Sequence, residues 1–397
     1  MDDRFAALAE LAVHGANVQH GQIVAVGAMV GQEALAREVA GAAYRRGAVF
    51  VDVTYFDPRV KRARIENADP DTLGFVPPWY GARLETIAER GDCRISLSGV
   101  ADPAPFAGLD PALVGRDALP ALKESAKVVN DRATNWTIVP CPHPEWAKVV
   151  FPDLPEDEAF ERLWSELWTI LRLDEPDPGA AWDERTAALK RSAAALDERR
   201  FDRLELVGPG TELTVGLLPS SDWWAGDFTT RTGVRHLPNL PTEEVFATPD
   251  PLRTEGHVTS TRPLVLKDGT TIRGLRVRFE EGRAVEIDAD ENGPALRSQA
   301  DKDEGATRLG EVALVDRRGR IGPLGTVFYD TLLDENAASH IALGDGSDEG
   351  LSEEDSARRN RSSIHIDFMI GGDDVAVTGI TREGDRVPVL RDGGWEL

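Results

Sequence analysis

The segment QIVAVGAMVGQEALAREVAGAAYRRGAVFVDVTY, which spans residues 22–55, contains two apolar runs separated by a stretch with helical periodicity. The apolar runs, residues 22–28 and 49–55, have the length and composition of buried strands, and residues 33–46 place apolar side chains on one side of a helix. A strand, a helix and a second strand in this order form the unit that connects parallel strands. The segment therefore predicts an α/β layer built on a parallel sheet.

Strand-like and helical segments continue to alternate after this unit and then give way to short strands. The first half adds strands at 93–98 and 137–140 and helices at 80–90, 120–130, 156–173 and 181–200. From about residue 201 the strands are joined by turns, with strands at 203–207, 211–217, 263–266, 271–279 and 284–289 and turn signals at 268–269 and 281–282. We therefore predict an N-terminal α/β domain over residues 1–200 and a mainly antiparallel α+β domain over residues 201–397.

Length, composition and charge limit the classes of function. A chain of 397 residues exceeds what one hydrophobic core usually organises, which favours two domains. Its apolar residues form no run of about 20, the length that a membrane helix needs, so we expect no membrane partner. The net charge of −24 argues against a nucleic-acid partner, since phosphate binding needs clustered Lys and Arg. The N-terminus lacks the basic and apolar regions of a secretory signal, and we expect a cytoplasmic protein.

A segment near the C-terminus combines an imidazole with a carboxylate. Residues 363–370 read SIHIDFMI, and the alternation predicts a strand with apolar residues on one face and His365 and Asp367 on the other. Two donor groups that converge from a rigid strand make a natural half of a metal site. By itself the pair is also compatible with a hydrogen-bonded polar pair on a strand surface.

Three further residues offer metal-binding groups, each with a structural alternative. Glu311 enters an otherwise apolar strand and Glu244 precedes apolar residues that Pro249 closes, so either carboxylate could be a strand-edge charge. His340 follows an acidic turn and small residues that allow close approach, although it could also start a capped helix and face the core. The residues alone leave these alternatives open.

Eight motifs spread along the chain carry a resemblance to a known family. The second half contains NLPTEEVF (239–246), LGEVAL (309–314), DENAASHIALG (334–344) and NRSSIHIDFMIG (360–371). The earlier part contains NWTIVP (135–140), followed by WAK (146–148) and FPD (151–153), and GPGTEL (208–213). Taken in order, these motifs resemble the thermophilic-type metallo-aminopeptidases of the aminopeptidase T family, and the likeness runs through nearly the full chain.

The resemblance implies a metal site in the C-terminal domain with five ligands, Glu244, Glu311, His340, His365 and Asp367. It implies two divalent metal ions per chain, zinc or cobalt, with manganese or magnesium as further candidates, and a carboxylate that bridges them. Two such ions activate a water, polarise the scissile carbonyl and can hold the free N-terminal amine of a peptide. The resemblance therefore implies a metal-dependent aminopeptidase that acts on peptides, with Glu311 as a catalytic residue, and a homodimer.

Two residues depart from the pattern of that family. Ser347 stands where family members usually carry a Tyr that is proposed to assist the transition state. A serine hydroxyl is shorter and less acidic than a phenol, so it reaches the same point only through a bridging water. Glu243 stands where family members tend to have Gly. Ser347 is therefore a candidate catalytic residue at the position of the Tyr.

Two other functions remain as alternatives. The chain resembles, more distantly, ring-cleaving dihydroxypyridine dioxygenases, which hold one iron by His and Asp. The presence of Glu244 and Glu311 together with both histidines favours the two-metal hydrolase. The absence of the Tyr leaves a third alternative, a metal-binding or peptide-binding protein with weak catalysis.

Overall fold

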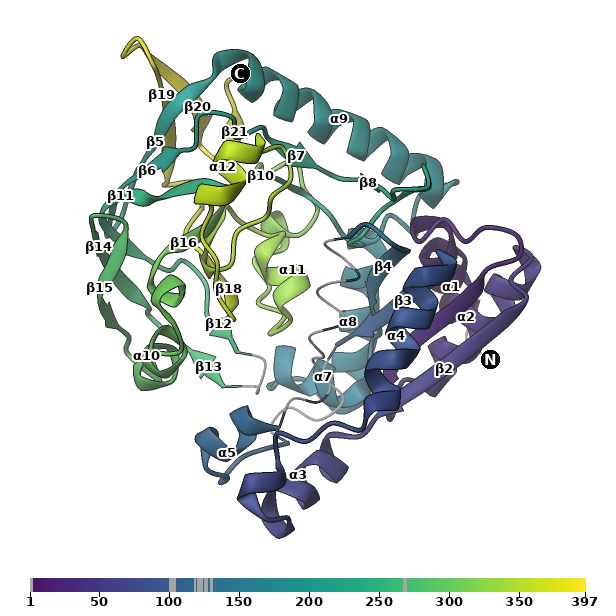
Figure 1. The fold of residues 1–397 in the computed structure, drawn as a ribbon. Coiled ribbons are helices and arrows are strands. Elements are labelled where there is room, and N and C mark those ends of the chain that lie inside the picture. Colours follow the sequence, from purple (N-terminus) through teal and green to yellow (C-terminus); the bar gives the residue numbers. More distant parts are fainter. Residues whose placement is uncertain are drawn as a thin grey trace. The chain divides into compact units, whose positions relative to one another are not determined.

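The computed structural model describes residues 3–99, 105–117, 119, 124, 128, 131–266 and 270–397. The contacts between residues divide the chain into two units, which Figure 1 shows with the sequence coloured from purple to yellow. Unit 1 consists of Met1–Asp183 with Asp227–Pro241, and unit 2 consists of Glu184–Gly226 with Thr242–Leu397. The chain therefore passes from one unit to the other three times, after Asp183, Gly226 and Pro241.

Unit 1 contains a four-stranded sheet in the order β2-β1-β3-β4. Its strands are β1 (Ile23–Met29), β2 (Phe50–Phe56), β3 (Cys93–Ser98) and β4 (Asn135–Pro140), and each neighbouring pair is parallel. The helices are α1 (Asp3–Gly15), α2 (Glu33–Arg45), α3 (Pro58–Asn67), α4 (Pro78–Arg90), α5 (Pro111–Arg116), α7 (Pro144–Val150), α8 (Glu156–Ile170) and the start of α9 (Pro178–Arg199). The parallel α/β layer that the sequence predicts is confirmed.

Capping residues explain where several helices of unit 1 begin and end. Helix α3 begins after Asp57, whose side chain accepts a hydrogen bond from the backbone N–H of Arg59. Pro58 occupies the first helical position, where a backbone N–H has no partner inside the helix. Helix α4 ends at Gly91, whose φ of +66° lies in the left-handed region that glycine adopts without strain.

The structure differs from the predicted elements in a few places. It contains helices α1 and α3, for which we predicted no element. The strand predicted at 271–279 is two strands, β13 (Thr271–Ile272) and β14 (Arg276–Glu280), since Gly274 between them has a φ of +61°. The predicted turn at 268–269 and nearly all of the helix predicted at 120–130 lie outside the described residues.

Unit 2 contains two larger antiparallel sheets. The first sheet has eight strands in the order β15-β14-β11-β6-β5-β19-β20-β21. Their bounds are β5 (Phe201–Gly208), β6 (Thr211–Leu217), β11 (Pro249–Thr259), β14, β15 (Arg283–Asp288), β19 (Ala376–Thr381), β20 (Arg386–Arg391) and β21 (Gly394–Trp395). The second sheet has five strands in the order β18-β17-β16-β10-β7. Their bounds are β7 (Trp224–Ala225), β10 (Glu244–Ala247), β16 (Leu309–Val315), β17 (His340–Gly344) and β18 (His365–Met369).

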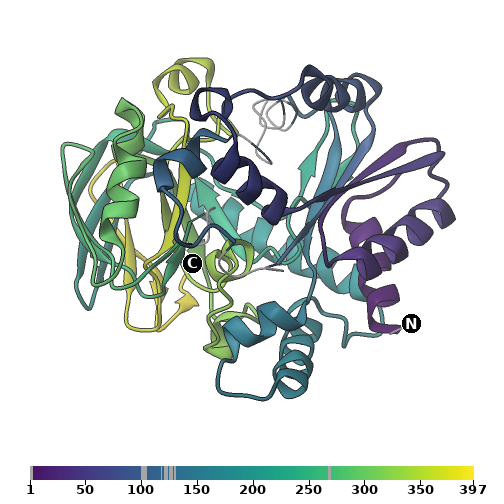
Figure 2. The same cartoon turned by 90° about the horizontal axis from the view of Figure 1, so that it is seen from below.

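Shorter elements complete the described part of the chain. Strand β12 (Leu264–Val265) pairs with β13 in unit 2, and β8 (Phe228–Thr229) pairs with β9 (Arg235–His236) in unit 1. Helix α10 (Gly293–Ala300) lies beside β15, as Figure 2 shows, and the other elements of unit 2 are η2 (Glu304–Thr307), η3 (Gly322–Leu324), α11 (Thr331–Glu335) and α12 (Glu353–Arg358). Unit 1 also contains η1 (Pro70–Thr72). Every helix of the described residues is too short or too polar to cross a membrane.

The core of unit 2 draws buried side chains from both of its larger sheets and from helix α9. Leu196 of α9, Leu213 of β6 and Leu314 of β16 all belong to this hydrophobic cluster. The five-stranded sheet therefore presents one face to the core. Its strands are antiparallel, so the mainly antiparallel α+β architecture predicted for the C-terminal part is confirmed.

Candidate metal centre

Four adjacent strands of the five-stranded sheet carry the predicted metal ligands. Glu244 begins β10, Glu311 lies in β16 and His340 begins β17. His365 and Asp367 lie in β18, which confirms the strand predicted around them. His340 therefore starts a strand, and the alternative in which it starts a helix is wrong.

The register of the sheet brings these side chains to one face. Ala342 of β17 pairs with Glu311 of β16 on one side and with Asp367 of β18 on the other. Directly paired residues, and residues two apart in one strand, project from the same face of a sheet. The same rule places both histidines and Glu244 on this face. Ala342 is buried, and its small side chain leaves space between the two carboxylates.

The opposite face of the same strands belongs to the hydrophobic core. Val245, Val312, Ile341, Leu343 and Phe368 alternate with the site residues and lie in the core of unit 2. All five are at most 1% exposed. Because this face is fixed by packing, the strands hold the polar side chains of the other face on a rigid support.

Glu244, Glu311 and His340 form a first group of donor atoms. Nε2 of His340 lies 3.1 Å from Oε2 of Glu244 and 3.4 Å from Oε1 of Glu311. Nδ1 of His340 donates a hydrogen bond to the carbonyl oxygen of Ala338, at 3.1 Å. Since a carbonyl oxygen only accepts, Nδ1 carries the proton, and Nε2 of the neutral ring turns its lone pair toward the carboxylates.

Glu311, His365 and Asp367 form a second group. Nε2 of His365 lies 3.3 Å from Oδ1 of Asp367 and 3.8 Å from Oε2 of Glu311. Nδ1 of His365 donates to the carbonyl oxygen of Asp345 at 2.8 Å, which orients this ring in the same way. The side chain of His365 is 39% exposed, whereas that of His340 is 1% exposed, so the second group is the more open one.

Glu311 connects the two groups. Its Oε1 faces His340 and its Oε2 faces His365. Within each group of three residues, the donor atoms lie within 4.8 Å of one another. Ligand atoms that are each about 2 Å from one cation are typically about 3–4 Å apart, so the spacing in each group is close to that of a coordination sphere.

The negative charges of the site stabilise positively charged groups. Burial raises the pKa of Glu311 above its ordinary value, and the negative charges of Asp367 and Glu244 add to the effect. Burial lowers the pKa of His340, yet its contacts with Glu244 and Glu311 outweigh burial and raise that pKa well above its ordinary value. For His365, burial is likewise outweighed by Asp367 and Glu311, and the pKa rises to about 10. The cluster therefore stabilises added positive charge, whether a proton or a metal ion.

The donor set also fits a divalent cation. Imidazole nitrogens together with carboxylate oxygens are ligands that zinc and cobalt accept. Oδ1 of Asp367 is buried and has no hydrogen-bond partner among the described residues. In the neutral form of the His365 ring, Nδ1 donates to Asp345, and Nε2, 3.3 Å from that oxygen, carries no proton. A buried carboxylate oxygen without a donor is costly, and a cation removes that cost.

A fourth acidic residue lies near this site, although the sequence did not single it out. Glu335 ends helix α11, and its charged neighbours are Asp367, Glu244, His340 and Glu311. Burial raises the pKa of Glu335 well above its ordinary value, and the nearby carboxylates raise it further. Glu335 stands in the motif at 334–344, but it lies five residues before His340, a spacing that by itself indicates no shared face. Glu335 lies near the site because the chain leads from helix α11 into strand β17.

Glu243, the residue before Glu244, is fully buried in an ionic group. Nε of Arg185 in α9 donates to Oε2 of Glu243, and Nη2 of Arg185 donates to Oδ1 of Asp316 at 2.9 Å. The backbone N–H of Glu243 donates to Oδ1 of Asn336 at 2.6 Å. A buried carboxylate is tolerated when a cation pairs with it, which explains how this position accepts Glu in place of Gly. The same contacts fix the start of β10 beside the site.

Ser347 belongs to neither group of donor atoms. It follows β17, and its hydroxyl accepts a hydrogen bond from the backbone N–H of Glu349 at 3.1 Å. Its carbonyl oxygen accepts a hydrogen bond from Oγ1 of Thr248 at 2.8 Å. The structure therefore brings together the five predicted ligands and Glu335, while the Ser347 hydroxyl contacts its own loop.

The buried side chain of Asn360 connects the strands that carry the predicted ligands. Nδ2 of Asn360 lies 2.8 Å from the carbonyl oxygen of Gly305, 3.2 Å from that of Arg308 and 2.6 Å from that of Gly344, and it donates to them. Asn360 is 5% exposed. These contacts tie the segment before β16 to the end of β17. Since Gly344 pairs with His365, Asn360 also helps to set the position of that histidine.

The chain is similar to known proteins over nearly its whole length. Aminopeptidase T of Thermus thermophilus is 42% identical over 398 residues, covering 98% of this chain and 97% of that protein. Aminopeptidase PepS of Streptococcus thermophilus is 35% identical over 399 residues, covering 98% of this chain and 96% of that protein. The structure of wild-type AmpT from Thermus thermophilus matches with a TM-score of 0.92 and 41% identity, covering 100% of this chain and 99% of that one. Residues 1–395 also match the sequence profile of the thermophilic metalloprotease (M29) family, and the chain belongs to that family.

Proposed function

We propose that this protein removes N-terminal residues from peptides at a centre of two divalent metal ions. The chain is a metallo-aminopeptidase, a hydrolase that acts on peptide bonds, as its family membership and its named relatives support. The observation that carries the two-ion proposal is the pair of donor groups that share Glu311 on one face of the sheet. None of the named relatives is a dioxygenase, so nothing supports the single-iron alternative.

The proposed ligands are those that the sequence predicts. Glu244, Glu311 and His340 would hold one ion, and Glu311, His365 and Asp367 would hold the other. The donor set favours zinc or cobalt, with manganese or magnesium as further candidates. When bound, such ions polarise a carbonyl group and lower the pKa of a water molecule so that it can attack at neutral pH. We propose Glu335 as an additional acidic group of the same centre.

The protein's own residues orient the proposed metal ligands and provide the negative charge of the site. The carbonyl oxygens of Ala338 and Asp345 fix the two imidazole rings, and the core face of the sheet keeps the strands in place. The carboxylates of the site attract the ammonium group at the N-terminus of a peptide, which favours cleavage next to a free N-terminus. Blocking that amine removes the positive charge and therefore the attraction.

Three further features remain proposals. We propose residues 201–397 as the catalytic domain and residues 1–200 as its α/β partner domain. We also propose a homodimer, as the sequence resemblance implies, and a cytoplasmic location. Ser347 remains a proposed catalytic residue at the position of the family's Tyr. Its replacement by Ala should lower kcat, and its replacement by Tyr should raise kcat, whereas equal rates in all three forms would remove Ser347 from the mechanism.

The experiment that tests the proposed function begins with protein stripped by a chelator and dialysed. Zinc, cobalt or manganese is then added in steps, and both bound metal and release of nitroaniline from leucyl-p-nitroanilide are measured. We expect activity to appear with metal and bound metal to approach two ions per chain. N-acetyl-leucyl-p-nitroanilide serves as the control, because it lacks the free amine. Binding of two ions without activity on any aminoacyl-nitroanilide or peptide would contradict the peptidase proposal.

A further inference from the structure

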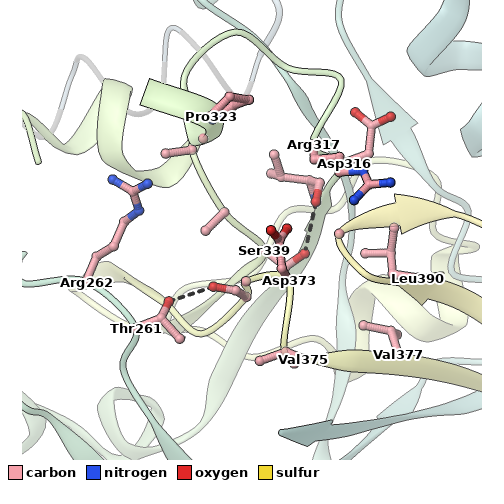
Figure 3. A pocket seen from close by; sticks show the side chains of 17 residues that line it. Thr261, Arg262, Asp316, Arg317, Pro323, Ser339, Asp373, Val375, Val377 and Leu390 are labelled. Atoms are coloured by element: carbon pink, nitrogen blue, oxygen red, sulfur yellow. Dashed lines mark hydrogen bonds between the residues drawn. The ribbon is translucent and has the colours of Figure 1, made fainter. Parts of the chain in front are cut away.

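Unit 2 contains a pocket of about 440 Å³ at the ends of the central strands (Figure 3). Its wall includes Val315 at the end of β16, Ser339 before β17 and Gly371 after β18. None of the five predicted ligands lines it, and neither does Glu335. The volume lies in the range of about 300–1,000 Å³ that is usual for small-molecule sites. The pocket is therefore a separate site from the metal centre.

Arg262 brings a nearly buried positive charge to this pocket. Its side chain is 13% exposed, and its Nη1 donates to the carbonyl oxygen of Thr326 at 2.7 Å. The nearest carboxylate oxygen, Oδ1 of Asp334, is 4.0 Å away, too far for a hydrogen bond. Among the described residues, Nε and Nη2 of Arg262 have no hydrogen-bond acceptor. A guanidinium offers paired N–H donors that match the two oxygens of a carboxylate.

Three further charged residues line the pocket: the buried Asp316, which pairs with Arg185, and two residues at the edge. Arg317 and Asp373 line it and are exposed. In the view of Figure 3, Arg262 and Arg317 stand on opposite sides, and Asp373 lies between them. Asp373 offers a carboxylate to a positively charged group of a ligand. The pocket therefore presents charges of both signs.

Much of the remaining wall is apolar. Val377 of β19, Val375 just before it, Leu390 of β20 and Pro323 of η3 contribute aliphatic surface, and Ala337 and Ala338 add small side chains. The hydroxyl groups of the wall have partners already, since Oγ1 of Thr261 donates to the carbonyl of Gly371 at 2.7 Å and Oγ of Ser339 accepts from the N–H of Val315 at 3.0 Å. A ligand would thus meet aliphatic side chains between the charged groups.

We propose that this pocket binds a free α-amino acid with an apolar side chain. The carboxylate of the ligand pairs with Arg262, its ammonium group pairs with Asp373, and its side chain packs against Val375 and Leu390. The inference goes beyond the proposed peptidase function and does not depend on it, because the binding groups lie outside the metal centre. It connects with that function in one respect, since an aminopeptidase releases free amino acids.

Binding of L-leucine to the full-length protein, measured by isothermal titration calorimetry, tests the proposal. Two analogues separate the charges of the ligand: 4-methylpentanoate lacks the amine, and 3-methylbutylamine lacks the carboxylate. We expect leucine to bind at least tenfold more tightly than either analogue. We expect Arg262→Gln to weaken leucine at least tenfold, and His365→Ala, which changes the metal centre, to leave leucine binding in place. Arg276→Gln is the matched control, because Arg276 lies on the exposed surface of β14 and pairs with Asp288 and Asp290.

A second variant covers the case in which Arg262→Gln does not fold. Asp373→Asn changes an exposed residue, and we expect it to weaken leucine while leaving the weak binding of 4-methylpentanoate unchanged. Three results would overturn the proposal: no heat of binding with leucine at millimolar concentration, leucine binding that Arg262→Gln and Asp373→Asn leave unchanged, or leucine binding that only His365→Ala removes. The last result would place the amino acid in the metal centre. Failure of the peptidase assay would leave each of these measurements interpretable.

Discussion

The two faces of the five-stranded sheet in unit 2 come from the same strands and have opposite chemistry. One face carries Phe368 and Leu343 into the hydrophobic core, and the other face carries Asp367, Glu311 and His340 into the candidate metal centre. On the core face each side chain gains from burial, about 1.5–3 kcal/mol for a large aliphatic or aromatic group. On the site face, carboxylates are brought together with few hydrogen-bond donors, which is unfavourable until cations bind.

The residues of the core face therefore stabilise the fold, whereas the residues of the site face are proposed to bind metal and to support the reaction. Changes on the core face should lower the free energy of unfolding with or without metal. Changes on the site face should abolish metal binding and activity, while the metal-free protein stays as stable as before or becomes more stable, as is common for strained functional sites. Four substitutions test this separation, in order of decreasing effect.

Glu311→Gln should have the largest effect, because Glu311 belongs to both donor groups. We expect kcat/KM for leucyl-p-nitroanilide to fall on the order of 10³-fold or more, since metal ions contribute several kcal/mol to transition-state stabilisation. Thermal unfolding of the metal-free variant should occur at the wild-type temperature or above it. The control is Glu286→Gln, an exposed residue that pairs with Arg278. If the Glu311→Gln variant kept activity within tenfold of wild type, Glu311 would not be a metal ligand that the reaction requires.

Phe368→Ala tests the core face next to a proposed ligand. Phe368 is 0% exposed, and replacing a buried Phe by Ala typically costs about 3–5 kcal/mol of stability. Urea unfolding of the metal-free protein measures the loss. Its neighbour Asp367, replaced by Asn, provides the matched comparison from the other face and should cost little stability in the absence of metal. If both variants lost the same amount of stability, the two faces would not be separable.

Asn360→Ala tests whether the hydrogen bonds of this buried side chain to the chain around β16 and β17 matter for metal binding. The substitution removes the side-chain donor shared by three carbonyl oxygens, of which those of Gly305 and Arg308 keep a backbone donor, and we expect a loss of about 1–3 kcal/mol in the free energy of unfolding. Because Gly344 pairs with His365, metal affinity should fall as well, which a competition titration with a chromogenic chelator measures. Asn67→Ala, which removes an exposed bond to Ala63 in unit 1, is the control and should change neither quantity.

Asp197→Asn asks whether a half-buried carboxylate of helix α9, outside the candidate metal centre, carries a similar, smaller penalty. Burial is the main cause that raises the pKa of Asp197 to about 6, and Asp222 adds to it although the N–H of Trp223 donates to the carboxylate. In the unfolded chain the pKa is about 4, so the folded state binds more protons between about pH 4 and pH 6. The contribution of this group to stability therefore falls as the pH rises through that window.

The amide of Asp197→Asn does not titrate and still accepts from Trp223. We expect the variant to be more stable than wild type at pH 7, with the difference shrinking toward pH 4. Urea unfolding at several pH values between 4 and 7 measures this difference. A difference that stays constant across the range would mean that the Asp197 carboxylate does not have a raised pKa.

The sequence predicts the elements that have a continuous apolar run or a regular alternation of side chains. The apolar runs at 22–28 and 49–55 become β1 and β2, and the alternation at 363–370 becomes β18 with its two donors on one side. Strand β11 was not predicted, because Pro249, Pro251 and Gly256 interrupt its pattern, and its register with β6 shifts between Pro249 and Thr254. A strand that tolerates such residues depends on its neighbours, which the local sequence does not reveal.

For the candidate site too, the local sequence does not reveal what depends on neighbouring strands. The motif positions indicate which residues could bind metal, and the five predicted ligands lie together in the structure. The sequence does not indicate that Ala342 separates Glu311 from Asp367, because this depends on the pairing of three strands. It does not indicate Glu335 either, whose approach depends on how α11 leads into β17. Contacts between segments that are distant along the chain are set by tertiary packing rather than by local pattern.

The unequal exposure of the two histidines has a consequence for how the enzyme would lose its metal. His340 is enclosed, whereas the ring of His365 is open to solvent, although both face the same carboxylate. With two ions bound as proposed, the ion beside His365 would exchange quickly with the solution, and the ion beside His340 would leave only when the surrounding strands open. Dilution into a weak chelator should then produce a half-loaded form that persists, and its rate of decay would report the local opening of β17 rather than the affinity of its ligands.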